Sequence, residues 1–378
     1  MKLKTILVWL IGLDVRAMKG LLQEYLDSVG ETRFYECYRA NLALPIFKAK
    51  LKLTRRCNLQ CVKCNYWRRI VRDELTTDEV LSVIDQLSEM GCRTIKFSGG
   101  EVLLRKDIFA LLKHAKERGI ATSITSNGTL IDKTTASKLV RSGLDSITIS
   151  IDSHEPETHD KIVGVRGSWK RSTAAIKNLK ESSKMLKRDL IIALQSVVLK
   201  SNYHKLPEII KLANKLNINK LSLLSFVDHH LKDKGERMNR NDLAYSSVHL
   251  LRELYDSAGE LGVKIVNYGP LQLYPQHIRI DNNILKTDIY SKIPCFVPWM
   301  NVYISSNGDV YACCSSKLPS FRMGNIRTSR LDYLANSMAF RDFRKSSKPP
   351  INRRICGLCL NEIKLNKTIY EKFKHLIA

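Results

Sequence analysis

The sequence predicts a parallel α/β fold followed by a smaller region of different character. From about residue 49, segments with the alternating pattern of strands are separated by segments with helical apolar spacing. Glycine, cysteine and polar residues stand just after the predicted strands, where parallel sheets carry their chemistry. After about residue 295, short strand-like segments, turns and cysteines replace the alternation. These three observations fit either an incomplete barrel or an open doubly wound sheet.

The N-terminal segment, residues 1–48, is predicted to be helical. Residues 5–29 are expected to form one or two amphipathic helices, because Met18, Leu21 and Tyr25 have helical spacing. The apolar run at residues 6–13 is far too short to span a membrane. Two roles remain open for this segment: docking on the body of the protein, or a peripheral contact with a membrane or a partner.

The core, residues 49–229, is predicted to contain six strands separated by five helices. In the first strand Leu51 and Leu53 alternate with lysines, and Thr76 with Glu79 forms a capping box before the first helix. The later strands are expected at residues 94–98, 120–125, 146–151, 190–199 and 220–226. The helices are expected at residues 80–90, 107–118, 132–142, 169–186 and 207–216. This alternation favours a parallel sheet with the helices outside it.

Three further segments follow the core. Residues 230–285 form a junction, with a helix near 246–261 and a short strand near 263–267. In residues 286–365, the dipeptide Asn307-Gly308 between two apolar segments predicts a β-hairpin. The basic tail at residues 366–378 is expected to be an exposed helix.

Composition limits the class of protein. A hydrophobic content of 44% is ordinary for a soluble globular chain. The formal net charge of +25 favours anionic partners, or reflects a solvated lysine-rich surface. Eight of the ten cysteines fall into two groups, which indicates metal ligation in a reducing, cytoplasmic compartment rather than a secreted disulfide scaffold. Cys37 and Cys92 stand apart and are interpreted as buried structural thiols.

The first cysteine group is Cys57, Cys61 and Cys64, on the loop after the first strand. Three thiolates on one short loop can hold three corners of an iron–sulfur cubane and leave the fourth iron open. Structural zinc is the alternative, but it takes four ligands, usually from paired C-x-x-C knuckles. No histidine nearby completes such a set.

The C-x-x-x-C-x-x-C loop, followed one βα unit later by Ser98-Gly99-Gly100-Glu101, resembles the radical S-adenosylmethionine (radical SAM) superfamily. The resemblance spans roughly residues 49–360 and implies a partial (β/α)6 barrel with a smaller α+β cluster-binding domain. It implies a 4Fe-4S cluster on the three cysteines, with SAM bound to the open iron. The SAM-binding residues that it implies are Ser98, Gly99, Gly100, Glu101, Ser126, Asn127, Ser150, Asp152 and Arg166.

Two positions depart from the family pattern. Lys63 stands before the third cysteine, where the family often has an aromatic side chain that stacks on adenine. Val163 stands where many members have an arginine, so Arg166 or Lys161 is the expected carboxylate partner.

The second cysteine group resembles the SPASM/twitch extension of these enzymes. The ligands implied for one auxiliary 4Fe-4S cluster are Cys295, Cys313, Cys356 and Cys359. Cys314 competes with Cys313, and adjacent strand residues point to opposite faces, so only one ligates easily. A four-cysteine zinc site is the alternative.

The resemblance implies reductive cleavage of SAM to a 5′-deoxyadenosyl radical that removes hydrogen from a substrate. The expected reaction is oxidation or epimerisation of a sugar-like or phosphorylated small molecule, because a single auxiliary cluster is counted. The alternatives are a ribosomal peptide maturase and, from another class, a zinc protein that binds nucleic acid through its basic surface. On the enzyme hypothesis no nucleic acid is expected, the substrate is a small molecule or peptide, and a flavodoxin or ferredoxin supplies electrons.

Overall fold

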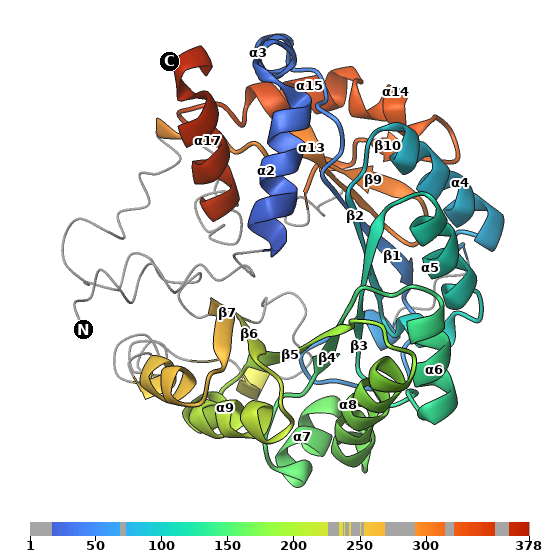
Figure 1. Cartoon of the computed structure of the whole chain (residues 1–378), viewed down its shortest axis with the longest axis vertical. Helices are drawn as coiled ribbons and strands as arrows, with labels where there is room; N and C mark the ends of the chain where they lie inside the picture. The colour runs from blue at the N-terminus through green and yellow to red at the C-terminus, as the bar shows by residue number, and fades with distance from the viewer. Residues whose placement is uncertain are drawn as a thin grey trace.

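The computed structural model describes residues 17–68, 73–225, 234–236, 238, 242, 250, 253–268, 292–313, 321–351 and 363–377. Its central feature is a ten-stranded sheet with the order β10-β9-β8-β1-β2-β3-β4-β5-β6-β7. The first seven strands are parallel neighbours in sequence order and curve into an incomplete barrel (Figure 1). These strands are β1 Lys48–Thr54, β2 Thr94–Gly99, β3 Ala121–Ser126, β4 Ser146–Ser150, β5 Ile191–Val198, β6 Lys220–Ser225 and β7 Lys264–Tyr268. The partial barrel and the predicted strands are therefore confirmed.

One helix follows most strands and covers the outside of the barrel (Figure 1). The helices are α4 Thr77–Glu89, α5 Ile108–Glu117, α6 Lys133–Arg141, α7 Pro156–Val163, α8 Ser168–Met185 and α9 Leu206–Lys215. The predicted capping box is present, since Thr76 Oγ1 accepts from the Glu79 N–H and Glu79 in turn accepts from the Thr76 N–H. The main apolar core lies between these helices and the outer face of the sheet.

Side-chain alternation gives the sheet two different faces. On β1, Ala49, Leu51 and Leu53 are buried in the core beneath the helices. Because successive side chains of a strand point to opposite faces, Lys50 and Lys52 project from the inner face of the barrel. Lys50 is in register with Lys96 of β2, so the inner face is cationic at this point.

The C-terminal region continues the same sheet. Strand β8 (Asn301–Ile304) runs parallel to β1, and β9 (Asp309–Tyr311) and β10 (Gly324–Asn325) follow antiparallel. The turn of the β8–β9 hairpin holds Asn307-Gly308, as predicted. Two helices that the sequence did not predict, α14 (Leu331–Ala335) and α15 (Met338–Lys345), also lie here, together with the short α13 (Val297–Met300).

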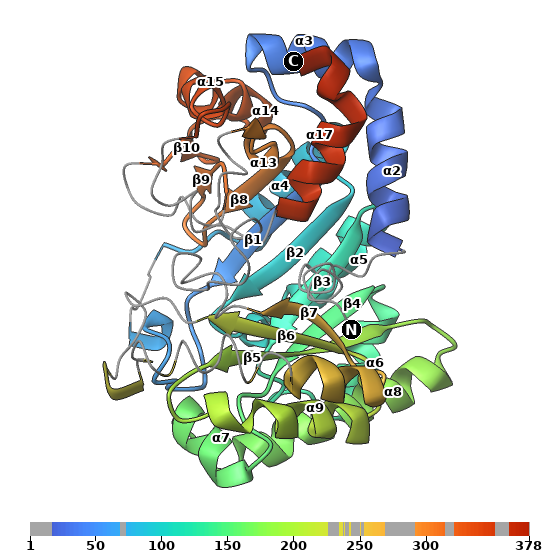
Figure 2. The ribbon, with the colours of Figure 1, turned by 90° about the vertical axis from the view of Figure 1, so that its left-hand side faces the viewer.

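Helices from the two ends of the chain pack together. The N-terminal helices α2 (Ala17–Val29) and α3 (Glu31–Ala40) lie beside the C-terminal helix α17 (Ile363–Ile377), as both views show (Figures 1 and 2). The expectation of an exposed tail was wrong: Ile369 and Phe373 are fully buried against Phe34 and Trp299. The tail helix is amphipathic, and its apolar face covers α3 and α13.

The described part of the N-terminal segment docks on the protein body, which is one of the two roles predicted for it. Residues 5–16 lie outside the described residues. Among the described helices, none combines the length and the apolar character that a membrane span requires.

Candidate active site

The cysteine loop leaves the carboxyl end of β1 and rests on α7. The Gln60 N–H donates to the Val163 carbonyl and the Val62 N–H donates to the Ile162 carbonyl, both at 2.9 Å. Gly164 ends α7 with φ of +73°, and a Cβ on it would lie 2.8 Å from the Gln60 carbonyl oxygen. A side chain at this position would therefore push the loop away from its seat.

An apolar patch beneath the loop completes that seat. Leu59, Ile162, Val163 and Leu199 form a buried cluster, and Cys57 and Cys61 pack against it. No helix was predicted from the sequence at α7 (Pro156–Val163). Its proline at the first helical turn and its glycine C-cap were the available signals.

Asparagine side chains join the first half of the loop to the end of β3. Asn127 Nδ2 donates to Asn58 Oδ1 at 2.9 Å, and Asn58 Nδ2 donates to Thr129 Oγ1 at 2.8 Å. Asn127 Oδ1 also accepts from the N–H and the hydroxyl of Thr129. The predicted residue Asn127 thus ties the Ser126-Asn127-Gly128 turn to the cysteine loop.

The three thiols of the loop are partly exposed, and two of them, Cys57 and Cys64, accept from backbone N–H groups. The Tyr66 N–H donates to Cys64 Sγ at 3.4 Å, and the Leu59 N–H donates to the Cys57 sulfur. Burial raises the pKa of Cys57 to about 11 and that of Cys61 to about 12, so these two thiols are protonated at neutral pH. Loading with iron would release these protons.

This donor set fits an iron–sulfur cluster. Three thiols are the ligands that such clusters take, and N–H groups directed at the sulfurs stabilise their negative charge. Within the described ranges, no three His, Cys, Asp or Glu side chains come close enough together to enclose one metal ion. A cubane cluster takes each thiolate at a different iron, so its ligands need not converge on one point.

Gly99, which ends β2, and Gly100, which follows it, let the backbone pack directly against the loop. A Cβ on Gly99 would overlap the Thr54 carbonyl oxygen, and one on Gly100 would overlap the Arg56 carbonyl oxygen. The Gly100 and Glu101 N–H groups donate to these same two carbonyls at 2.8 Å. The glycine pair therefore fixes the start of the cysteine loop.

Glu101 is fully buried at the centre of this edge of the sheet. Its carboxylate accepts from Ser126 Oγ at 2.8 Å, from the Asn127 N–H at 2.7 Å and from the Leu103 N–H at 3.2 Å. Burial raises the pKa of Glu101, while these donors act against that rise. In this structure Glu101 joins the ends of β2 and β3, and its contact with SAM stays a prediction.

Asp152, at the end of β4, is also fully buried and forms an ion pair with Lys63 of the cysteine loop. Its other carboxylate oxygen accepts from the Val197 N–H at 2.9 Å. The sequence placed both residues near the site, but it did not pair them, because they are 89 positions apart.

The remaining predicted SAM contacts lie at this edge or near it. Ser98 is buried, and its hydroxyl has no hydrogen-bond partner among the described residues. Ser150 is half-buried and ends β4 on the inner face. Arg166 is exposed in the turn between α7 and α8.

The second cysteine group is described only in part. The Cys295 N–H donates to the Ser347 carbonyl at 3.0 Å, and Cys313 follows β9. Both thiols are half-buried and pack against the apolar cluster formed by the terminal helices and α13, as does Cys37. Cys314, Cys356 and Cys359 lie outside the described residues, so the auxiliary ligand set stays a prediction.

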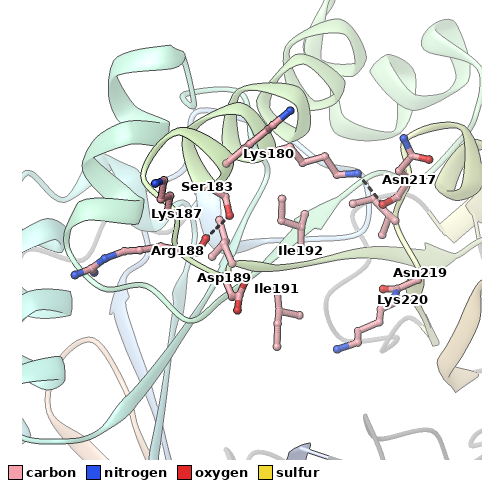
Figure 3. A pocket seen from close by; sticks show the side chains of 13 residues that line it. Lys180, Ser183, Lys187, Arg188, Asp189, Ile191, Ile192, Asn217, Asn219 and Lys220 are labelled. Carbon is pink, nitrogen blue, oxygen red and sulfur yellow. Dashed lines mark hydrogen bonds between the residues drawn. The ribbon is translucent and has the colours of Figure 1, made fainter.

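A basic pocket lies at the opposite, amino-terminal ends of β5 and β6 (Figure 3). Its volume is about 510 Å³, and Lys184, Lys187 and Arg188 line it with Asp189. Lys180 also lines it, and its ammonium group donates to the carbonyls of Leu216 and Asn217. The cysteine loop follows the carboxyl end of β1, so this pocket is separate from the candidate active site.

Family models match two regions of the chain. The model described as the radical SAM superfamily matches residues 51–213, and the one described as an iron–sulfur cluster-binding domain, SPASM, matches residues 295–360. Together these regions contain both groups of cysteines.

Several curated relatives are similar to the chain. The Fe-coproporphyrin III synthase of Methanosarcina barkeri is 33% identical over 194 residues, 51% of this chain and 46% of the relative. The AdoMet-dependent heme synthase of the same organism is 27% identical over 321 residues, 82% of this chain and 86% of the relative. The PqqA peptide cyclase of Granulibacter bethesdensis is 26% identical over 318 residues, 81% of this chain and 78% of the relative.

The fold is also similar to that of a solved structure. Streptococcus suis SuiB bound to its precursor peptide SuiA matches with a TM-score of 0.65 and 20% identity, over 84% of this chain and 71% of that chain. At this identity the likeness concerns the fold.

Proposed function

Because this chain belongs to the radical SAM superfamily and carries a SPASM-type iron–sulfur domain, we propose that Cys57, Cys61 and Cys64 hold its SAM-binding cluster and that it modifies a peptide. The cofactors of the family are SAM, a 4Fe-4S cluster that binds it and, in the C-terminal domain, an auxiliary cluster. When bound, the first cluster and SAM supply a 5′-deoxyadenosyl radical that abstracts hydrogen from substrate.

The chain's own residues position these groups. The backbone of Gly99 and Gly100, held against the loop, lies where the methionine part of SAM would approach. Ser98 offers a buried hydroxyl without a partner among the described residues, and Ser150 offers a second hydroxyl on the inner face of the barrel. We infer that these two hydroxyls, with the Asn127 turn, contact SAM, and that exposed Arg166 meets its carboxylate. Glu101 and Asp152 are proposed to act indirectly, by holding in place the turns that carry these groups.

The auxiliary cluster is proposed to bind Cys295, Cys313, Cys356 and Cys359. These residues fall at the two ends of the matched SPASM region, residues 295–360. A cluster there offers an acceptor for one electron from the substrate, so the proposed net change is an oxidation, such as a crosslink between side chains. A flavodoxin or ferredoxin is the proposed reductant.

The substrate class rests on the alignment with PqqA peptide cyclase, which covers 81% of this chain. The fold similarity to SuiB bound to the precursor peptide SuiA adds support. A peptide is therefore favoured over the sugar-like substrate that the cysteine count suggested, since the curated relatives named above act on peptides or tetrapyrroles.

A carboxylate-bearing tetrapyrrole is the second candidate. The alignment with the AdoMet-dependent heme synthase covers 82% of the chain. Lys50 and Lys96 are register partners on the inner face of the barrel, where ammonium groups would suit carboxylates.

The cluster assignment is tested by anaerobic iron–sulfur reconstitution. Wild-type protein should take up about eight irons, as two four-iron clusters require, and should release 5′-deoxyadenosine from SAM under dithionite. The triple variant C57A/C61A/C64A should take up about four irons and release none. Cys92→Ala, a matched loss of a buried thiol outside the loop, should behave as the wild type. Full SAM cleavage by the triple variant would refute the assignment.

The substrate class is tested by hydrogen transfer. Peptides encoded by short reading frames beside the gene, produced in deuterated medium, should transfer deuterium to 5′-deoxyadenosine, as read by mass spectrometry. Iron coproporphyrin III with deuterated propionate groups is the competing probe. Transfer from the porphyrin alone would overturn the peptide proposal in favour of the second candidate.

A further inference from the structure

The ion pair between Lys63 and Asp152 connects the cysteine loop to the barrel next to the third cysteine. Lys63 directly precedes Cys64, and its ammonium group donates to Asp152 Oδ2. The Lys63 side chain is 12% exposed and that of Asp152 is 0% exposed. A carboxylate so deeply buried requires a positive partner, and Lys63 provides it.

Asp152 is held rigidly from several elements. Its Oδ1 accepts from the Val197 N–H of β5 at 2.9 Å. Its own N–H donates to His159 Nδ1 of α7 at 3.1 Å, and its carbonyl accepts from Asn202 Nδ2 at 2.7 Å. The Asp152 carboxylate is therefore held in one position, and its ion pair with Lys63 determines where the loop beside Cys64 lies.

The pair also sets the charge beside the proposed cluster. Burial weakens screening, so a charge on either partner acts strongly on its surroundings. Paired, the two charges largely cancel. With Lys63 removed, the Asp152 carboxylate would stand alone near the cluster and oppose the electron that the cluster must accept. With Asp152 neutralised, the ammonium group would stand alone and favour that electron.

We propose that Lys63 and Asp152 are a positioning pair that orients the third-cysteine end of the loop and neutralises the buried carboxylate, so that the SAM-binding cluster can be reduced. The inference rests on the proposed function, because it presupposes a cluster on Cys57, Cys61 and Cys64. It gives Lys63 a structural and electrostatic role at the position where the family often has an aromatic residue.

The test is the midpoint potential of the SAM-binding cluster, measured by EPR-monitored redox titration of reconstituted protein without SAM. Lys63→Met should lower the potential, and Asp152→Asn should raise it. The double variant K63M/D152N, which removes both charges, should lie between the two single variants. A role limited to folding would not move the two single variants in opposite directions.

Matched variants keep the test decisive. Lys170→Met removes an exposed lysine from α8, outside the cysteine loop, and should leave the potential unchanged. Lys63→Arg keeps the charge and should keep the wild-type potential. If a single variant fails to take up iron, the comparison of K63M/D152N with K63R still tests the pair, because the double variant should bind SAM more weakly, by about tenfold, while K63R should not.

Two results would overturn the inference: shifts of the same sign in both single variants, or unchanged potential and SAM affinity in all variants. The proposed function fails on a different observation, which is wild-type protein that binds no cluster at these cysteines. If the wild-type enzyme cleaves SAM and the Lys63 and Asp152 variants keep the wild-type potential and SAM affinity, the inference fails while the proposed function stands.

Discussion

The rings of Phe34 and Phe373 stack with their centroids 3.9 Å apart and an interplanar angle of 14°. Phe34 belongs to α3 near the start of the chain, and Phe373 belongs to α17 near its end. Both side chains are fully buried, and Phe34 also packs against Phe296 beside Cys295. The two ends of the chain thus form one wall of the region that carries the second cysteine group.

Phe373→Ala should destabilise this wall. Removing a fully buried phenylalanine costs about 3–5 kcal/mol through lost burial and the cavity left behind. The free energy of unfolding, measured by chemical denaturation, should fall by that amount. Tyr333→Ala is the matched control, because Tyr333 is 70% exposed, and it should change stability by less than about 0.5 kcal/mol. Equal effects of the two substitutions would mean that the terminal helices contribute little.

Gly100→Ala should displace the cysteine loop. The new methyl group would overlap the Arg56 carbonyl oxygen, which also accepts the Glu101 N–H, so backbone must move on both sides. Such overpacking costs about 1–3 kcal/mol. We expect about tenfold weaker SAM binding by calorimetry, which is ~1.4 kcal/mol. Gly259→Ala is the control, since a Cβ there meets nothing within 4 Å, and it should leave the affinity unchanged.

Local patterns made most of the fold predictable. Strands and helices of the core differ in the period of their apolar residues, so each could be placed from its own segment. The location of the site followed from the parallel arrangement, because the carboxyl ends of β1 to β4 lie at the same edge of the sheet. The glycines, Asn127 and Asp152 could therefore be placed together from sequence.

Contacts between residues far apart in the chain could not be predicted from the sequence. Lys63 could be noted as unusual, but nothing local shows that it reaches Asp152. The tail helix looked exposed because it is basic, and its partner Phe34 lies at the other end of the chain. Helix α7 was missed because its polar first turn resembles a loop, although its last turn forms the seat of the cysteine loop.

Glu101→Gln should loosen the junction between β2 and β3. Each carboxylate oxygen of Glu101 accepts a hydrogen bond, and an amide group would turn a donor toward Ser126 or toward the Asn127 N–H. A buried donor without an acceptor costs about 1–3 kcal/mol. The amides of Asn127 and Thr129 should then exchange with deuterium about tenfold faster or more, as ~1.4 kcal/mol of lost protection implies. Glu89→Gln, at an exposed site, should leave those amides unchanged. Unchanged exchange in E101Q would mean that Glu101 does not hold the turn.

Arg327 joins the C-terminal region to the start of α4, and this contact should make stability depend on pH. Its guanidinium donates to both carboxylate oxygens of Glu79, at 2.5 and 3.0 Å, and to Asp73. Mainly through this contact, the pKa of Glu79 is lowered from its ordinary value of 4.5 to about 2. A carboxylate with a lowered pKa stabilises the fold above its unfolded pKa, and that contribution is lost as the pH falls.

The stability difference between wild type and Glu79→Gln should therefore be about 1 kcal/mol at neutral pH, a small value because both side chains are nearly one-third exposed. It should shrink steadily between about pH 4.5 and pH 2. Denaturant unfolding of both proteins across this range measures the difference directly. In the Arg327→Met background the stability difference between the protein with Glu79 and its Glu79→Gln variant should vary much less with pH, because the main contact that lowers the pKa is gone. A difference that persists at pH 2, or that survives the loss of Arg327, would assign the effect to the Thr76 capping box, since the Thr76 N–H also donates to Glu79 at 2.7 Å.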